Sequence, residues 1–399
     1  MNINIILKVL FFWICLLPIS YNGLSINYIF FLTPIIFLLL GHNLILPTSE
    51  YFIFITFFSL IFIFSIFLHS EYLVYFDRKI ISYLIFVLSL NLCFIKFNIK
   101  DVHYFKVAII LASLTNIIYS LTLFIFLGES ANSYESKDLI GSNRYGFIYI
   151  IAFWIVFFDK KIFMFSYLKE SIIFLLVIGI CFTFSRATIV SFTFSFFVYS
   201  LLYLGSFQIS LKKKFKFLLF FLVLSFCSLV AISAFAPVLL TFYADRIIDY
   251  VMSGGLATSL SQSDHSDGIR LIIWSNILNY IADNPLLGSG FLGFWVLNLK
   301  DFGFSAHNQY LDVLFRTGIL GFIVYSFLIY RIYKFSKSFD KSLYYGLIGI
   351  LLYGLFHETF KESQGAFIFS FLISLAHNKF SLSNEYITNN FNYKRYKNT

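Results

Sequence analysis

The chain has 399 residues, of which 59% are hydrophobic, 22% aromatic and only 12% charged, and its mean hydropathy is +0.84. Soluble domains carry about 25% charged residues, so this composition excludes an ordinary soluble protein and indicates an integral membrane protein. The net charge of +9 would suggest a nucleic-acid ligand in a soluble protein, but here the lysines and arginines are placed as membrane topology requires.

Apolar runs recur along the whole chain, and most are long enough to cross a hydrocarbon core of about 30 Å as a helix. We therefore predict an all-α membrane protein with about 12 transmembrane helices. The first run lacks a small-x-small cleavage site, so it is predicted to be a retained span. The predicted spans are 5–21, 24–46, 51–69, 80–97, 103–127, 145–158, 171–184, 187–205, 215–236, 307–332, 342–360 and 364–378.

Lysine and arginine gather in alternate connections and in the C-terminal tail, while the other connections hold most of the acids. The positive-inside rule then predicts that both termini are cytoplasmic. The resulting organisation has helices 1–9 in 1–236, an outer loop with an amphipathic helix in 237–306, helices 10–12 in 307–378 and a cytoplasmic tail in 379–399. The outer loop is too long for a simple connector.

The second half of the outer loop shows a helical pattern. It begins at Ile269, with Asp267 as a plausible N-cap, and its apolar stripe runs through Ile269, Ile273, Ile277 and Tyr280. The helix should stop at Asn284-Pro285, before a tight turn. Such a helix would lie against the bundle or the outer leaflet.

Several polar and basic residues stand at helix starts that face outward in this topology. Arg186 begins one span, Asn143 and Arg144 precede another, and Arg270 lies in the first turn of the loop helix. A helix N-terminus with an arginine favours an anion, and a guanidinium suits a diphosphate. The alternatives are that Arg186 snorkels to lipid headgroups and that Arg270 is a solvated loop residue.

His307 is predicted to lie in the first turn of span 307–332, where the helix dipole favours a neutral imidazole. A neutral imidazole can accept a proton from a hydroxyl, which is the work of a general base. The alternative is a histidine that only caps or hydrogen-bonds at the interface. Asn308 is expected to orient the backbone or His307, and too few ligands converge here to hold a metal.

Further along the same span, Asp312 and Arg316 are four residues apart and predict an intramembrane ion pair. Gly318 and Gly321 are typical of helix packing. The next span ends near a His-Glu pair, 357–358, which could reach the same cavity.

The ordered set of these residues resembles the O-antigen ligase and polymerase superfamily of bacterial surface polysaccharide assembly. The resemblance covers residues 141 to 330. The matching residues are Gly141-Ser142-Asn143, Ser185-Arg186, Arg270 with Trp274, Asn284-Pro285, Gly288, Gly290, His307-Asn308-x-Tyr310-Leu311, Gly318 and Gly321.

The resemblance implies a glycosyltransferase of the bacterial inner membrane with its active site on the periplasmic face. The donor would be an undecaprenyl-diphosphate-linked oligosaccharide, and neither a metal nor another cofactor is expected. Arg186 and Arg270 would hold the departing diphosphate, and His307 would activate the acceptor hydroxyl. The residues expected to contact substrate are Asn308, Trp274, Asn143 and Arg144.

Two acceptors fit this superfamily. A polymerase extends a growing lipid-linked glycan, whereas a ligase moves the finished chain to lipid A–core. The Phe-, Ile- and Lys-rich composition resembles proteins of AT-rich polysaccharide clusters, so we favour the polymerase, with a chain-length regulator as a further candidate partner. Outside enzymes the alternative is a flippase or other transporter, which should carry its charges at midplane depth along many spans.

Overall fold

The computed structural model is built from helices and one very short pair of strands. It describes residues 3–17, 20–21, 24–25, 32–46, 49–68, 90–127, 145–159, 162, 166–183, 185–204, 210, 212, 215, 266–290, 297, 306–359 and 362–377. The elements are α1 (Ile3–Leu16), β1 (Ser20–Tyr21), β2 (Leu24–Ser25), α2 (Thr33–Leu39), α3 (Ser49–Leu68), η3 (Leu90–Phe94), α5 (Ile99–Leu127), α6 (Gly146–Phe158), α7 (Ser166–Phe182), α8 (Arg186–Leu204), α12 (Ser266–Asp283), α13 (Gln309–Phe339), α14 (Lys341–Tyr353) and α15 (Ser363–His377). The helical fold class is therefore confirmed, with β1 and β2 forming a two-residue antiparallel pair.

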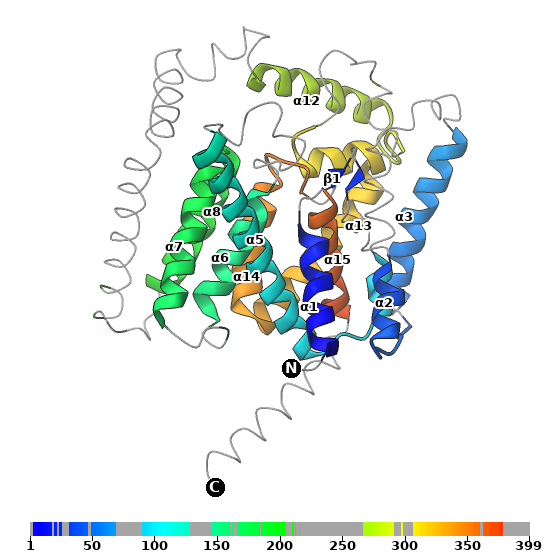
Figure 1. Ribbon diagram of the computed structural model, residues 1–399. Helices are drawn as coiled ribbons and strands as arrows, with labels where there is room; N and C mark the ends of the chain where they lie inside the picture. Colours follow the sequence, from blue (N-terminus) through cyan, green and yellow to red (C-terminus); the bar gives the residue numbers. More distant parts are fainter. Residues whose placement is uncertain are drawn as a thin grey trace.

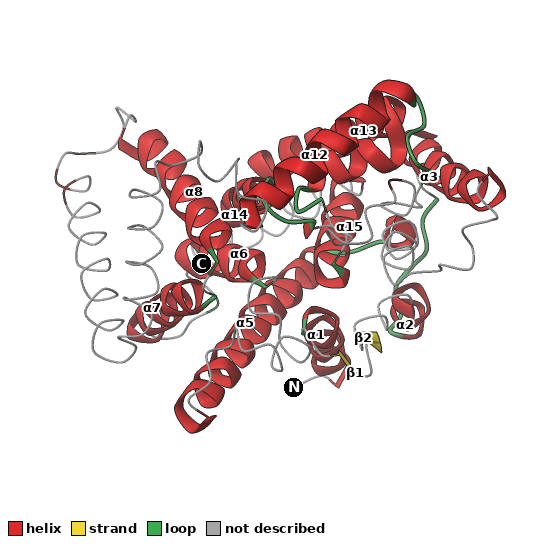
Figure 2. Cartoon of the chain, turned by 90° about the horizontal axis from the view of Figure 1, so that it is seen from above, coloured by secondary structure: helices red, strands yellow, loops and turns green. Residues whose placement is uncertain are grey.

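Most helices stand side by side, and α12 lies across one end of the bundle (Figure 1). The helices α6, α8, α13 and α15 begin at this end, while α5, α7 and α14 finish there. Seen from above, α12 runs close to α13 (Figure 2). Because the helices alternate in direction, the starts of four helices collect beneath α12.

The centre of the bundle is the contact between α6 and α14, where small residues let the backbones approach. A Cβ on Gly346 would lie 2.7 Å from a side-chain carbon of Ile151, and one on Gly349 would lie 2.4 Å from Ile150. Trp154 is fully buried beside them and donates to the Ser195 hydroxyl at 3.2 Å. Small residues at helix interfaces are typical of membrane bundles.

Apolar side chains also cover part of the outer surface. On α8, Val190, Phe194, Phe197 and Leu201 are each about half exposed. Among the described residues, two helices are long and apolar enough to cross a membrane, Ile99–Thr122 and Gln309–Phe339. These features agree with a protein embedded in lipid.

The twelve-span layout is not confirmed. The predicted span 24–46 is wrong as a continuous helix, because it contains β2, the seven-residue α2 and a non-helical segment. Pro34 lies in the first turn of α2, and Gly41, with φ of +83°, turns the chain away after the helix ends. A bridge then pairs Leu44 with Ile95, so the predicted span 80–97 also ends in non-helical backbone.

Other predicted spans differ mainly at their ends. The span 342–360 stops early, because α14 ends at Tyr353 and the chain turns back through 354–359. Apart from residue 215, the predicted span 215–236 lies outside the described residues. The same holds for the first half of the predicted outer loop, 237–265.

Candidate functional site

The loop helix α12 begins at Ser266, three residues earlier than predicted. Asp267 is therefore inside the first turn and the prediction that it is the N-cap is wrong, although the predicted end near Asn284 agrees with the structure. Ile273 and Ile277 of the predicted stripe are buried, and they pack with Phe315 of α13. This apolar face fixes α12 onto the first half of α13.

The turn that follows α12 docks into a break in α13. Gly318 has φ of +62° and ψ of −169°, so the helix is interrupted there rather than continuous as predicted. The amide of Ile319 donates to the Pro285 carbonyl at 2.8 Å, and the amide of Ser289 donates to the Phe315 carbonyl at 2.8 Å. The turn therefore takes up backbone groups that an unbroken helix would have paired internally.

Glycine is required on both sides of this junction. Gly288 and Gly318 have φ of +63° and +62°, a backbone conformation that residues other than glycine rarely adopt. A Cβ on Gly288 would lie 2.3 Å from the Phe315 carbonyl oxygen, and one on Gly318 would lie 2.2 Å from the Leu286 carbonyl oxygen. At these glycines the backbone of the turn after α12 is in direct contact with the backbone of α13. The prediction that Gly318 is a packing position therefore agrees with the structure, but the interruption of α13 at Gly318 was not predicted.

The segment before α13 is held from two directions. The Trp274 indole donates to the Ala306 carbonyl at 2.8 Å, while the Ala306 amide donates to the Glu358 carboxylate at 2.6 Å. The amide of Gln309 donates to the Gly354 carbonyl at 2.7 Å. Residues 306–309 are therefore fixed between α12 and the turn after α14.

His307 lies at the centre of this clamped segment. Its φ is +48°, the left-handed region, and its side chain is half-buried. Its ring centroid lies 6.4 Å from that of His357, nearly perpendicular to it, and His357 stacks on buried Tyr353 at 4.7 Å. A non-glycine residue held in this conformation is a strained position of the kind found at functional sites.

The prediction that His307 lies in the first turn of the helix is wrong. Asn308 is the N-cap of α13, and its side-chain oxygen accepts from the amides of Tyr310 and Leu311 at 3.0 Å. Since Gly354 takes the Gln309 amide, the first three amides of α13 all have protein partners. An anion beside His307 would therefore rely on side chains rather than on these N–H groups.

The two arginines predicted to bind the diphosphate lie on different helices, Arg270 on α12 and Arg186 on α8. Arg270 is half-buried and lies one turn before Trp274, so both share the face of α12 that meets Ala306. Arg186 is the first residue of α8, but its side chain lies outside the described residues. Asn143 and Arg144 also lie outside them.

The start of α8 abuts the start of α6, the helix that Asn143 and Arg144 precede. A Cβ on Gly146 would lie 2.0 Å from the Thr188 hydroxyl oxygen. Ser185 caps α8, since its hydroxyl accepts from the Thr188 amide at 3.3 Å. Phe147 of α6 in turn packs on Tyr353, with ring centroids 6.0 Å apart. The backbones next to the predicted site residues therefore meet at the end covered by α12.

Asp312 and Arg316 form the predicted ion pair. The Arg316 Nε atom lies 3.1 and 3.2 Å from the two carboxylate oxygens of Asp312. Both residues are almost completely buried within the first half of α13. This arginine therefore has a structural partner and is not assigned to the substrate.

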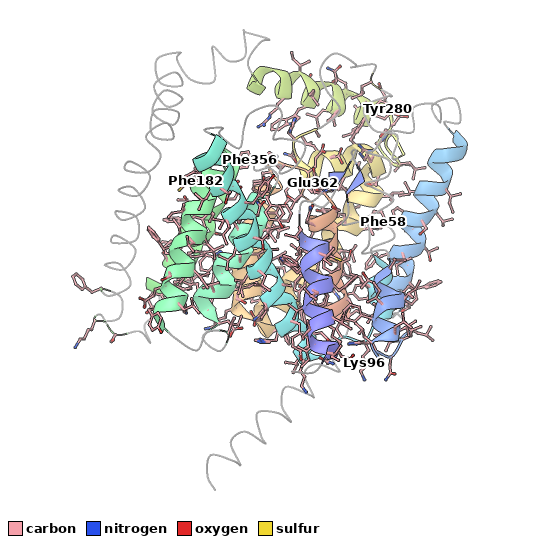
Figure 3. All side chains as sticks on the ribbon, in the orientation of Figure 1. Phe58, Lys96, Phe182, Tyr280, Phe356 and Glu362 are labelled. Carbon is pink, nitrogen blue, oxygen red and sulfur yellow. The ribbon has the colours of Figure 1, made fainter. Side chains whose placement is uncertain are left out.

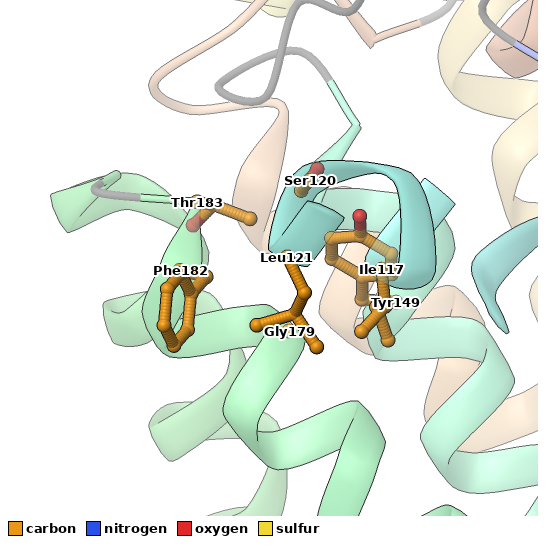
Figure 4. A pocket seen from close by; sticks show the side chains of 7 residues that line it. All are labelled: Ile117, Ser120, Leu121, Tyr149, Gly179, Phe182 and Thr183. Atoms are coloured by element: carbon orange, nitrogen blue, oxygen red, sulfur yellow. The ribbon is translucent and has the colours of Figure 1, made fainter. Parts of the chain in front are cut away.

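A cavity near the start of α8 is too small for a saccharide. Figure 4 shows it between α5, α6 and α7, with Ser120, Tyr149 and Thr183 among the side chains that line it. Its volume is about 10 Å³, which corresponds to roughly one water molecule. This cavity therefore cannot hold a sugar ring.

Sequence reasoning underestimated the turn after α14. It gave His357 and Glu358 only a possible reach toward the cavity, because span 342–360 was expected to continue past them. In the structure the turn supplies the carboxylate on Ala306 and the ring beside His307. The available signal was the His-Glu pair that ends an apolar run.

A comparison with known protein families finds a match in the part of the chain that holds these residues. The family model described as O-antigen ligase matches residues 171–326. No curated protein matches the chain. The matched region runs from α7 into α13 and includes Arg186, Arg270, Trp274 and His307. This match supports the predicted resemblance to the O-antigen ligase and polymerase superfamily, whose members are membrane enzymes of the glycosyltransferase type.

Proposed function

We propose that this protein is an O-antigen polymerase. It transfers an undecaprenyl-diphosphate-linked oligosaccharide onto a sugar hydroxyl of another lipid-linked repeat unit. The family match supports the reaction class. The observation that carries the site assignment is the clamped, left-handed His307, held through hydrogen bonds on both sides of Ala306.

In the proposed reaction the imidazole of His307 accepts the proton of the acceptor hydroxyl. The hydroxyl oxygen then bonds to the anomeric carbon as the bond from that carbon to the diphosphate oxygen breaks. The lipid diphosphate leaves with the electron pair, and the proton on His307 returns to solvent or to the diphosphate. The energy comes from the donor itself, so no nucleotide is consumed.

The departing diphosphate needs positive charge close to the breaking bond. Arg270 is suited to this role because its face of α12 meets the segment that carries His307. Arg186, the first residue of α8, is assigned the same role. Both assignments are independent of metal, since guanidinium groups can hold both phosphates bidentately.

The clamp gives a physical reason for the position of His307. A left-handed non-glycine residue costs of order 1–3 kcal/mol, so its surroundings must hold it in place. Trp274 and Glu358 do so through the Ala306 peptide. A base held rigidly in this way needs little reorganisation when the acceptor arrives.

The end covered by α12 is proposed to face the periplasm. Lys96, Lys100, Lys337 and Lys341 lie at the other end of the helices, near the start of α5 and the corner between α13 and α14. Cytoplasmic connections are enriched in such residues. With this orientation we propose that both termini are cytoplasmic, as the charge distribution predicts, and that the donor lies in the bacterial inner membrane.

A ligase is the second candidate, because the matching family is described as O-antigen ligase. The donor chemistry would be unchanged, and the acceptor would be lipid A–core. The site residues serve both reactions equally. The choice of polymerase follows the Phe-, Ile- and Lys-rich composition.

A gel of surface glycolipid separates these functions. Cells lacking the gene are complemented with the wild type or with Arg270→Ala. Core carrying a single repeat unit in the null strain identifies a polymerase, whereas bare core with polymer stranded on the lipid carrier identifies a ligase. A normal ladder in both null and Arg270→Ala cells overturns the glycosyltransferase assignment for this polymer and favours a transporter or another polysaccharide.

A further inference from the structure

A second pocket lies at the end of the bundle opposite α12, and the reaction does not use it. Its volume is about 460 Å³. Figure 3 shows Lys96 at this end, while Tyr280 of α12 lies at the other. The polar side chains that line it are Lys8, His42, Asn43, Lys96 and Asn98.

One wall of this pocket is fixed by backbone hydrogen bonds. The segment after α2 pairs with the segment before α5 at the bridge between Leu44 and Ile95. The Lys96 amide donates to the Asn43 carbonyl at 3.1 Å, and the Ile45 amide donates to a carbonyl of η3 at 2.8 Å. Asn43 and Lys96 therefore stand side by side in a defined geometry.

Charge in the back of the pocket is balanced. The Lys8 ammonium donates to the fully buried Asp101 carboxylate at 3.1 Å and to His42 Nε2 at 2.6 Å. His42 Nδ1 lies 3.1 Å from the Lys96 carbonyl, which can only accept, and His42 Nε2 lies 3.6 Å from a carboxylate oxygen of Asp101. Lys8 and Asp101 thus cancel each other.

The mouth of the pocket keeps a positive charge. Lys96 is exposed there, and within the described part of the chain no carboxylate pairs with its ammonium. Asn43 and Asn98 also line the pocket; the side-chain oxygen of Asn98 accepts from the Asp101 amide at 3.0 Å, so its NH2 group is the part that can donate to a ligand. This set of groups is suited to a phosphate and disfavours a cation.

The surface next to the mouth is apolar. Ile35 and Leu39 of α2 are 56% and 82% exposed, and Leu44 and Leu46 just after it are 54% and 90% exposed. A soluble phosphate compound would leave this surface in water. An amphiphile with an anionic head and acyl chains would cover both features at once.

We propose that this pocket binds the headgroup of an anionic phospholipid. The phosphate contacts Lys96, Asn43 and Asn98, and the acyl chains lie along the exposed leucines of α2 and the segment after it. Basic pockets between helices on the cytoplasmic side of membrane proteins bind such headgroups. The lipid would hold α1, α2 and the start of α5 together, independently of glycosyl transfer.

The test uses the purified full-length protein in detergent, with phosphatidylglycerol or phosphatidylcholine added. Bound lipid is counted by native mass spectrometry, and the thermal midpoint of unfolding is followed in parallel. Lys96→Gln removes the exposed charge without disturbing the buried Lys8 pair. Lys337→Gln is the matched control, because it removes the same charge from an exposed position at the same end.

Phosphatidylglycerol should bind and raise the thermal midpoint of the wild type, while phosphatidylcholine should not. The affinity of the protein for phosphatidylglycerol should fall about fivefold in Lys96→Gln, since one lysine near an anionic headgroup contributes about 1 kcal/mol. Lys337→Gln should bind as the wild type does. An equal loss in both variants, no preference for the anionic lipid, or equal stabilisation by inorganic phosphate alone would each overturn the proposal.

Discussion

The two ends of the helical bundle stabilise their polar groups in different ways. At the end covered by α12, His307, Gly288, Gly290 and Gly318 all have positive φ, and the buried pair of Asp312 and Arg316 lies within the single helix α13. At the other end Gly41 also has positive φ, and the described ion pairs join different helices to one another. There the Lys106 ammonium lies 2.5 Å from the Asp340 carboxylate and 3.3 Å from the Asp159 carboxylate. Asp101, which is also on α5, pairs with Lys8.

This difference separates function from stability. Strained backbone is found where a structure must present a group in a costly conformation. In a buried ion pair, the loss of either partner instead lowers the unfolding free energy, because the other charge is left buried and unpaired. We therefore expect side-chain changes at and beside His307 to reduce transfer more than they reduce stability, and the loss of a charged partner at the opposite end to do the reverse.

The largest effect is expected for His307→Ala. Loss of a general base should reduce the transfer rate by about 100-fold to 10,000-fold, with little change in the thermal midpoint. His307→Gly also removes the imidazole but relaxes the left-handed backbone, so it should be equally inactive and no less stable. His357→Ala is the control for loss of a neighbouring ring, and an unchanged rate in His307→Ala would remove the base assignment.

The second prediction concerns the opposite end. Lys106→Met leaves the carboxylates of Asp159 and Asp340 without their shared cation; because these carboxylates are 20% and 24% exposed, the loss of unfolding free energy should be less than the roughly 3–5 kcal/mol of a fully buried pair. The transfer rate per folded molecule should stay at the wild-type value. Lys334→Met, an exposed position on α13, should change neither quantity. A specific loss of transfer in folded Lys106→Met would contradict the separation of the two ends.

The third prediction compares two glycines with positive φ. Gly41→Ala meets no atom within 4 Å, so its cost should be only the left-handed backbone, about 1–2 kcal/mol. Gly318→Ala has the same backbone penalty and also places its Cβ 2.2 Å from the Leu286 carbonyl oxygen. It should therefore be clearly less stable than Gly41→Ala and should lose transfer. Equal unfolding free energies would show that the turn does not rest on α13.

The smallest effect is expected for Trp274→Phe. The ring is kept, but the hydrogen bond to the Ala306 carbonyl is lost, at a cost of about 0.5–1.5 kcal/mol. If that bond positions His307, the transfer rate should fall by up to about tenfold. In His307→Ala the same change should have no additional effect on the rate. Additive losses in the double variant would show that Trp274 acts separately from His307.

The sequence predicted much of this arrangement where local patterns decide structure. Hydrophobic runs located α3, α6, α8 and α15 to within a few residues, because an apolar helix is the default for such a run. The four-residue spacing of Asp312 and Arg316 correctly predicted their ion pair. Asn284-Pro285 likewise marked the end of α12.

Long-range backbone contacts were not predictable in this way. Nothing in the sequence near Gly318 shows that a turn from 285–289 takes its neighbours' hydrogen bonds. The bridge between Leu44 and Ile95 similarly replaced two predicted helix ends. The position of Glu358 depends on where α14 ends. The apolar run was expected to stay helical to residue 360, but α14 ends at Tyr353, with Gly354 as its C-cap.

The central claim is that the lipid diphosphate binds under α12, between Arg270 and His307. Electron cryomicroscopy of the full-length protein with undecaprenyl diphosphate in a lipid nanodisc tests this most directly. We predict phosphate density within hydrogen-bond distance of the Arg270 guanidinium, with the His307 ring facing the space beside it. Diphosphate density elsewhere, with Arg270 and His307 in contact only with protein, would contradict the account.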